Sequence, residues 1–210
     1  MPGHILLFLR PRDDQVARFQ QWRKGIFYNH TNIVPHLYLD AIDMITEAYI
    51  YPYVNIYRFL DSAALVASQI EQQLHSDSAK VHLSTFHWQL YSTTAETRSS
   101  SRPAATVVAV GLTIPTDPVS HRELNEWYTE EHVPALATVP GWQAAIRLQL
   151  LQASTKDAAE YAAPYLAIHE WGEPNELGQE SWKKANSTPG IARISDLQTA
   201  PIHRRVWKSV

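Results

Sequence analysis

The stretch LNEWYTEEHVPALATVPGW, residues 124–142, decides how this sequence of 210 residues is interpreted. Apolar and aromatic side chains recur in it at the three- and four-residue spacing of a helix that buries one face. That face comprises Leu124, Trp127, Tyr128, Glu131 and His132. A titratable imidazole on the buried face of a helix needs a hydrogen-bond partner or a cavity. The role of His132 is therefore the central question.

Polar residues and a proline set the expected limits of this helix. The segment Ser120–Glu123 fits the S-x-x-E capping box, which predicts that the helix begins near His121. Pro134 has no amide hydrogen and disfavours helical geometry at the preceding residue, so the helix is expected to end at Val133. These limits place His132 at the inward end of the helix.

Two roles are open for His132. The ordinary pKa of an imidazole suits general acid/base catalysis, and Tyr128, four residues earlier on the same helical face, can touch it. The alternative is a core histidine that is bonded to a backbone carbonyl. A comparison of the two halves of the chain bears on this choice.

The chain divides near its middle at residues 93–106, a Ser-, Thr- and Ala-rich segment that is typical of a linker. The two flanking halves share one succession of patterns. Trp22 precedes Val34-Pro35 by twelve residues, and Trp127 precedes Val139-Pro140 by the same interval. Strand-like runs are expected at residues 5–11, 41–50, 53–61 and 86–92, and at 107–115, 142–151, 165–173 and 202–209.

A helical segment precedes the closing strand of each half, at residues 61–74 and less regularly at 175–187. Each half therefore has the ferredoxin-like order β–α–β–β–α–β. A sheet with helices on one side leaves its other face bare, and a second copy can cover that face. The predicted fold is α+β, with ferredoxin-like repeats at 1–92 and 107–210 that form one pseudo-symmetric barrel. Two independent domains on a flexible linker would expose apolar strand positions.

The repeat distinguishes shared framework residues from residues that only one half carries. Phe27 occupies the position of His132, and Tyr57 aligns with His169. The framework therefore needs no histidine at position 132, which weakens the purely structural role. Strand alternation puts His169 on one face with Trp171, where it lines a cavity or packs across strands. The halves are interpreted as specialised, with one retained site in the C-terminal half.

The composition excludes several kinds of site. Without cysteine there are no disulfides, thiolate nucleophiles or cysteine-ligated metals. No H-x-x-x-H or H-E-x-x-H spacing occurs, and no glycine-rich phosphate loop is present, so neither a metal site nor a nucleotide site is expected. A net charge of −3 predicts no nucleic-acid or membrane partner. The absence of a signal-peptide pattern and of long apolar runs predicts a cytoplasmic protein.

One motif connects these residues to known proteins. Three stretches resemble the EthD-like branch of the dimeric α+β-barrel superfamily. They are W-Y-x-x-E-H-V-P at residues 127–134, V-P-G-W at 139–142 and the strand Y-L-A-I-H-E-W at 165–171. The resemblance implies that this chain is a tandem-fused pseudo-dimer with a ligand cavity between the helices and the sheet of a unit. The family's motif histidine falls on His132. The first half lacks both E-H-V-P and P-G-W, so a second catalytic site is not expected there.

The residues and the resemblance together predict a cofactor-independent acid/base enzyme. Its substrate would be a polyketide-like or aromatic carbonyl compound of secondary metabolism, and its reaction a cyclisation, isomerisation, dehydration or decarboxylation. His132 and Tyr128 are the expected catalytic residues, and the expected substrate-binding residues are Trp127, Trp142, His169 and Glu131. No metal or cofactor is expected.

Other functions stay open at this point. A cofactor-free monooxygenase of a hydroxyaromatic compound would use the same pocket. The degenerate first half is also compatible with a non-catalytic protein that binds small molecules. A haem protein would need a single axial histidine, which nothing in the sequence specifies. The expected partner in most of these functions is an aromatic or polyketide-like small molecule, and the fused barrel is compatible with a homodimer.

Overall fold

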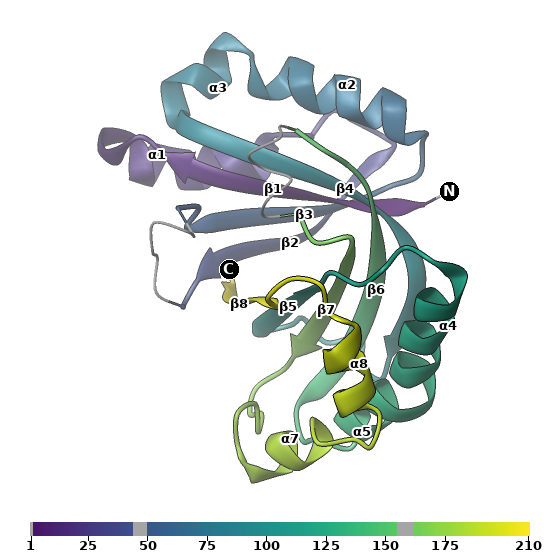
Figure 1. The fold of residues 1–210 in the computed structure, drawn as a ribbon. Coiled ribbons are helices and arrows are strands. Elements are labelled where there is room, and N and C mark those ends of the chain that lie inside the picture. Colours follow the sequence, from purple (N-terminus) through teal and green to yellow (C-terminus); the bar gives the residue numbers. More distant parts are fainter. Residues whose placement is uncertain (1, 44–49, 155–161) are drawn as a thin grey trace. The chain divides into compact units, whose positions relative to one another are not determined.

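A computed structural model describes residues 2–43, 50–154 and 162–210 of the chain. The strands in these ranges, which Figure 1 labels, are hydrogen-bonded in the order β1-β3-β2-β8-β5-β7-β6-β4, and the last strand pairs with the first as in a closed barrel. This order confirms the predicted α+β fold of two ferredoxin-like halves in one chain. Two compact units can be distinguished, one containing residues 1–93, 148–162 and 207–210 and the other containing 94–147 and 163–206.

The first unit is built on four antiparallel strands with helices on one face. Its strands are β1 (Gly3–Pro11), β2 (Ile33–Ala41), β3 (Tyr53–Phe59) and β4 (Leu83–Arg98). Its helices are α1 (Val16–Trp22), α2 (Ala63–Leu74) and α3 (Asp77–His82), with short 3₁₀ turns at Asp13–Gln15 and Arg23–Gly25. Ser62 and Ser76 cap α2 and α3 by accepting hydrogen bonds from backbone amides, which satisfies donors that a helix start leaves free.

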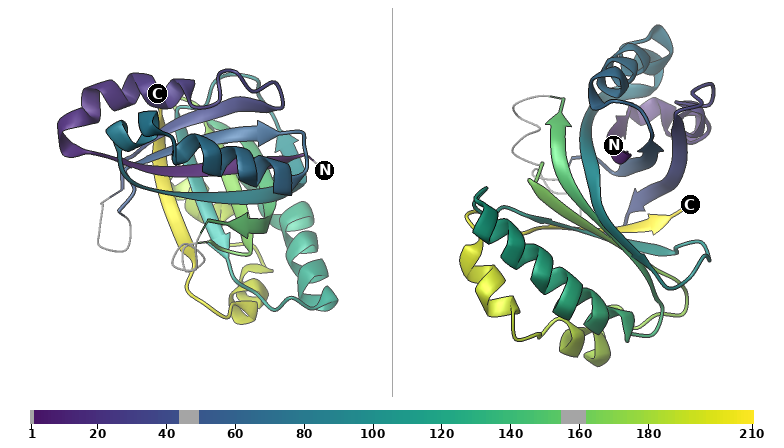
Figure 2. Two further views of the ribbon diagram at one scale, coloured as in Figure 1. Left: turned by 90° about the horizontal axis from the view of Figure 1, so that it is seen from above. Right: turned by 90° about the vertical axis from the view of Figure 1, so that its right-hand side faces the viewer.

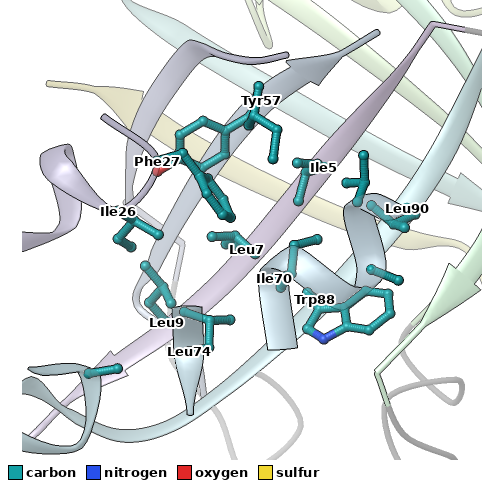
Figure 3. Close-up of a cluster of buried hydrophobic side chains, with 14 of the residues drawn as sticks. Ile5, Leu7, Leu9, Ile26, Phe27, Tyr57, Ile70, Leu74, Trp88 and Leu90 are labelled. Carbon is teal, nitrogen blue, oxygen red and sulfur yellow. The ribbon is translucent and has the colours of Figure 1, made fainter. Parts of the chain in front are cut away.

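The core of this unit is a cluster of buried apolar side chains between the strands and the helices (Figure 3). Strand periodicity directs Ile5, Leu7 and Leu9 to this core, and each is completely buried. Phe27 and Tyr57 meet edge to face in it, with ring centroids 4.9 Å apart at 84°. Trp88 completes the core at its β4 side.

The second unit repeats this plan with a different helical layer. Its strands are β5 (Thr106–Leu112), β6 (Trp142–Ala153), β7 (Tyr165–Trp171) and β8 (His203–Ser209), although residues 148–153 and 207–209 of these strands are counted with the first unit. Its helices are α4 (Pro118–Glu126), α5 (Val133–Ala137), α7 (Glu180–Ala185) and α8 (Ile191–Leu197). Helices α4 and α8 lie side by side (Figure 2), and an ion pair between Glu123 and Arg193 joins them at 3.4 Å.

The start of α4 differs from the prediction. Asp117, and not Ser120, caps the helix: its carboxylate accepts hydrogen bonds from the amides of Val119 and Ser120 at 2.9 and 3.1 Å. Pro118 follows at the first helical position, where its missing amide hydrogen costs nothing. The Ser120 hydroxyl donates a hydrogen bond to the Asp117 carboxylate. Ser120 was the predicted cap, and it instead supports the residue that caps the helix. The capping-box prediction is therefore wrong by one turn.

The end of the helix also differs. The segment Trp127–His132 is a π-helix, and the chain continues directly into α5 through Pro134. The amide of Val133 donates to the carbonyl of Tyr128, five residues earlier. This wider turn accommodates the missing amide of Pro134, so the proline does not end the helical segment. π-Helical turns occur frequently at functional sites.

The second strand of the first half is displaced from its predicted range. Of the predicted strand at 41–50, residues 44–49 lie outside the described residues, and β2 ends at Ala41. Val34 and Pro35 lie within β2, where the register shifts between Pro35 and Leu37, as expected for a residue without an amide hydrogen. Val139-Pro140 instead precedes β6. The prediction that the two Val-Pro pairs occupy equivalent places in the two halves is therefore wrong.

The turn before β6 explains the P-G-W part of the motif. Gly141 has φ +87°, and a Cβ atom there would lie 2.3 Å from Cβ of Asn175. The Gly141 carbonyl also accepts a hydrogen bond from the Gly172 amide at 2.8 Å. Glycine is therefore required for conformation and for space.

Two further observations concern the limits of the units. Strand β4 runs to Arg98, so strand geometry covers residues 93–98 of the segment that was interpreted as a linker. None of the helices in the described ranges is both long and apolar enough to cross a membrane.

Candidate active site

The second unit contains a cavity of about 180 Å³ between its strands and its helices. Its lining is mainly apolar and aromatic: Val108, Val110, Leu112, Trp127, Tyr128, His132, Leu136, His169, Trp171, Leu177, Trp182, Asn186, Ile191, Ile194, Gln198, Ile202 and Arg204. Pockets for drug-sized ligands usually measure ~300–1,000 Å³. This smaller volume favours a compact ligand, with one or two rings enclosed.

His132 lies in the wall of this cavity, with only 7% of its surface exposed. Its imidazole stacks on the indole of Trp127 at a centroid distance of 4.4 Å and an angle of 18°. Tyr128 meets the same imidazole edge-on at 5.4 Å and 76°. An α-helix would direct residues five apart to different faces, whereas the π turn brings Trp127 and His132 together. The prediction of a simple helical face found the contact with Tyr128 and missed the stacking.

The segment between α7 and α8 fixes Trp127. The indole Nε1 donates to Oγ1 of Thr188 at 2.9 Å. Gly190 follows, and a Cβ atom there would lie 2.5 Å from Cδ1 of Trp127. Only glycine lets the backbone approach this closely. Thr188 and Gly190 therefore hold the ring on which His132 stacks.

Glu131 anchors the same segment from the outside. Its carboxylate accepts a hydrogen bond from the Gly190 amide at 2.7 Å and another from Arg193 at 3.1 Å. It does not line the cavity. The predicted substrate-binding role of Glu131 thus has no geometric basis, because the π turn rotates its side chain away from the face of His132.

His169 reaches the cavity from β7. Its ring lies 5.7 Å from that of His132 at 86°. It is 4% exposed, and β-pairing sets it opposite Val108 of β5. The Nδ1 atoms of His132 and His169 and the Nε1 atom of Trp171 are buried without a hydrogen-bond partner among the described residues. Buried polar atoms are normally paired, so three orphans at one cavity indicate groups that await a ligand.

Burial controls the protonation of these groups. Desolvation lowers the pKa of His132 to about 4 and that of His169 to about 3, and the neighbouring His132 lowers the pKa of His169 further. Both imidazoles are therefore neutral near pH 7. Burial raises the pKa of the Tyr128 hydroxyl above its usual value, although the Arg147 guanidinium, 5.6 Å from the ring centroid, acts in the opposite direction. Tyr128 thus stays a hydrogen-bond donor.

Four of the six predicted site residues meet at the cavity: His132, Tyr128, Trp127 and His169. Trp142 does not line it and packs in the core instead. The sequence prediction missed Trp182, Thr188 and Arg204 as site residues. Only Arg204 carried a usable signal, since strand alternation puts it on the same face as Ile202 and Val206 in a predicted strand.

The described residues offer no ready metal centre. No group of three or more His, Asp or Glu side chains that could hold a metal ion occurs within residues 2–43, 50–154 and 162–210. A cavity of about 180 Å³ is also smaller than pockets for drug-sized ligands, so it favours a ligand smaller than a tetrapyrrole.

Comparisons with known proteins establish the fold. No family model and no curated protein sequence matches the chain. Among solved structures, one described as an anthrone oxidase-like protein has a TM-score of 0.66 and 13% identity, covering 100% of this chain and 91% of that one.

Two structures described as "putative monooxygenase" also match. The one from Fusobacterium nucleatum subsp. nucleatum has a TM-score of 0.61 and 7% identity, covering 99% of this chain and 92% of that one. The one from Lactobacillus acidophilus NCFM has a TM-score of 0.59 and 7% identity, covering 99% and 93%. At these identities the likeness shows the fold alone, which is an α+β barrel of two ferredoxin-like halves over the full length of a single chain.

Proposed function

We propose that this chain is a cofactor-independent enzyme that removes a proton from a compact aromatic carbonyl compound, with His132 as the base. The observation that carries the proposal is a neutral imidazole in an apolar, aromatic cavity, whose Nδ1 has no hydrogen-bond partner among the described residues. A neutral imidazole can accept a proton, and the surrounding rings suit a flat substrate. The W-Y-x-x-E-H-V-P motif further supports membership of the EthD-like branch.

The enolate itself and two neighbouring residues would assist the proton transfer. A pKa of about 4 describes His132 in the empty cavity, and an enolate formed beside the imidazolium would supply the missing counter-charge and raise that pKa. The indole of Trp127, stacked at 4.4 Å, stabilises a cation through its π-face. The Tyr128 hydroxyl would donate to the oxygen on which negative charge develops.

The enolate has two chemical fates. Protonation or attack at another carbon gives isomerisation, cyclisation, dehydration or decarboxylation without an oxidant. Addition of O₂ is the second candidate, because the fold neighbours are described as anthrone oxidase-like and monooxygenase proteins. In that reaction a CH₂ group and O₂ give a carbonyl group and water, with the carbon oxidised and both oxygen atoms reduced.

Proton exchange tests the base directly. The two-ring ketone 2-tetralone carries acidic CH₂ hydrogens, and their replacement by deuterium in D₂O can be followed by NMR. The His132→Phe variant keeps an aromatic ring against Trp127 and removes the base, so exchange should slow at least ~100-fold. The control is His203→Gln, a histidine of β8 that does not line the cavity. A folded His132→Phe protein that exchanges at the wild-type rate would exclude His132 as the base.

An oxygen electrode separates the two fates. Oxygen uptake that matches substrate loss supports the monooxygenase, and substrate loss without uptake supports the cyclase, isomerase or lyase.

A further inference from the structure

We propose that Arg204 binds a carboxylate at the mouth of the cavity, so that the ligand is a compact aromatic acid whose ring enters toward His132. The identification of this ligand as a substrate rests on the proposed function, whereas the preference for an acid rests on the geometry of Arg204 alone.

Arg204 is an exposed residue of β8 that also lines the cavity. Its Cζ atom lies 5.8 Å from the centroid of the Trp182 ring, which holds the guanidinium by a cation–π contact. It makes no ion pair with any residue in the part of the chain that the structure describes. A cation that is fixed by an aromatic ring and carries no counter-ion is a candidate anion site.

The first unit shows that the fold does not require an arginine at this position. The closing strands predicted at residues 86–92 and 202–209 match at their second residues, His87 and His203, so Arg204 is equivalent to Trp88. Trp88 is 2% exposed, packs in the core, and donates from Nε1 to Glu71 at 2.7 Å. The strand position that is filled by a core indole in one half thus holds an exposed cation beside a cavity in the other.

The lining of the cavity selects the sign of the ligand's charge. None of the described residues that line it is acidic, and Arg204 is the basic residue that is charged near pH 7 among them. The planar guanidinium matches a carboxylate in a two-bond arrangement. Gln198 adds a side-chain amide to the same lining. The rest of the lining is apolar and suits an aromatic ring. A guanidinium at one end and an apolar lining elsewhere together match an aromatic carboxylic acid.

A matched pair of ligands tests the inference. The acid 2-naphthoate and its neutral isostere 2-naphthamide differ in charge and little in shape, and their dissociation constants can be measured by calorimetry. Wild-type protein should bind the acid about tenfold more tightly, as expected for a charge-assisted pair. Arg204→Gln should abolish this preference. Arg204→Lys should retain part of it, because lysine keeps the charge and loses the fork.

Arg193→Gln is the control, since Arg193 is a half-exposed arginine that pairs with Glu123 and Glu131 outside the cavity. It should leave the preference unchanged. The inference is overturned if the wild type does not prefer the acid, if it binds neither compound, or if Arg204→Gln keeps the preference.

The His132→Phe variant keeps this test separate from that of the proposed function. It should lose proton exchange and keep the preference for the acid. A lost preference in Arg204→Gln together with unchanged exchange in His132→Phe would refute the base and leave the carboxylate site standing. The reverse pair of results would refute the carboxylate site alone.

Discussion

Each half of the chain brings two aromatic or imidazole rings together at equivalent positions, but the chemistry of the rings differs between the halves. In the first unit Phe27 and Tyr57 meet edge to face at 4.9 Å and 84°. In the second unit His132 and His169 meet at 5.7 Å and 86°. The Tyr57 hydroxyl has partners, since it accepts from Asn55 at 2.9 Å and donates to the Arg23 carbonyl at 3.4 Å.

The histidine pair lacks such partners on Nδ1 among the described residues. The geometry of a ferredoxin-like unit therefore needs two rings at this place and does not need them to be imidazoles. A fold that can close its core with Phe and Tyr keeps two unsatisfied, desolvated histidines only at a cost in stability. Such local costs are concentrated at functional sites.

The largest loss of stability should follow when the arginine of position 204 is introduced at the equivalent position of the first unit, Trp88. Trp88→Arg would place a guanidinium where an indole is 2% exposed. The loss of the packed indole and the desolvation of the guanidinium, which the neighbouring Glu71 carboxylate offsets only in part, should together destabilise the protein by ~4 kcal/mol. Urea unfolding measures this loss.

Arg204→Gln is the matched change in the other half and should cost less than ~0.5 kcal/mol, because Arg204 is exposed. Similar losses for the two variants would contradict the view that the halves have specialised at this position.

A smaller loss of stability is expected when the histidine of position 132 is introduced at the equivalent position of the first unit, Phe27. Phe27→His would put an imidazole into a closed core, where Phe27 is 2% exposed. Lost apolar burial and an unsatisfied ring nitrogen should together destabilise the protein by ~2–3 kcal/mol at pH 7.5. The reciprocal His132→Phe should be within ~1 kcal/mol of wild type or more stable. Equal destabilisation by both exchanges would show that each ring is simply fitted to its own core.

Local sequence patterns predict the strands of this fold well and the details of its helices less well. Alternation identified β1, β3 and β7 because each has one face against a core. It also placed His169 and Trp171 together. The repeat pointed to His132 through Phe27, even though the aligned Val-Pro pairs lie in different structures.

The remaining features depend on hydrogen bonds that spacing does not reveal. A π turn has no distinct residue pattern, so the stacking of Trp127 on His132 and the outward turn of Glu131 could not be anticipated. Thr188 and Gly190 act on Trp127 from 61 and 63 positions further along the chain. Trp182 and Arg204, which are 22 positions apart in the chain, become neighbours only in the folded protein.

The smallest predicted effect concerns pH. Burial lowers the pKa of His132 from 6.5 to about 4, so between these values the unfolded chain binds a proton that the folded protein does not. Stability therefore rises with pH across this window and falls as the pH drops from 6.5 toward 4. His169, with its pKa lowered to about 3, and His87, lowered to about 4, contribute in the same direction.

His132→Phe removes one of these three contributions. The loss of unfolding free energy between pH 7.5 and pH 5 should therefore be ~1–2 kcal/mol smaller in this variant than in wild type. Urea unfolding at the two pH values measures the difference. An unchanged loss would mean that His132 is charged or solvated in the folded protein at pH 5. A buried, neutral imidazole in the position that Phe27 fills in the first unit is the feature that distinguishes the two halves, so that result would remove the physical basis for this distinction.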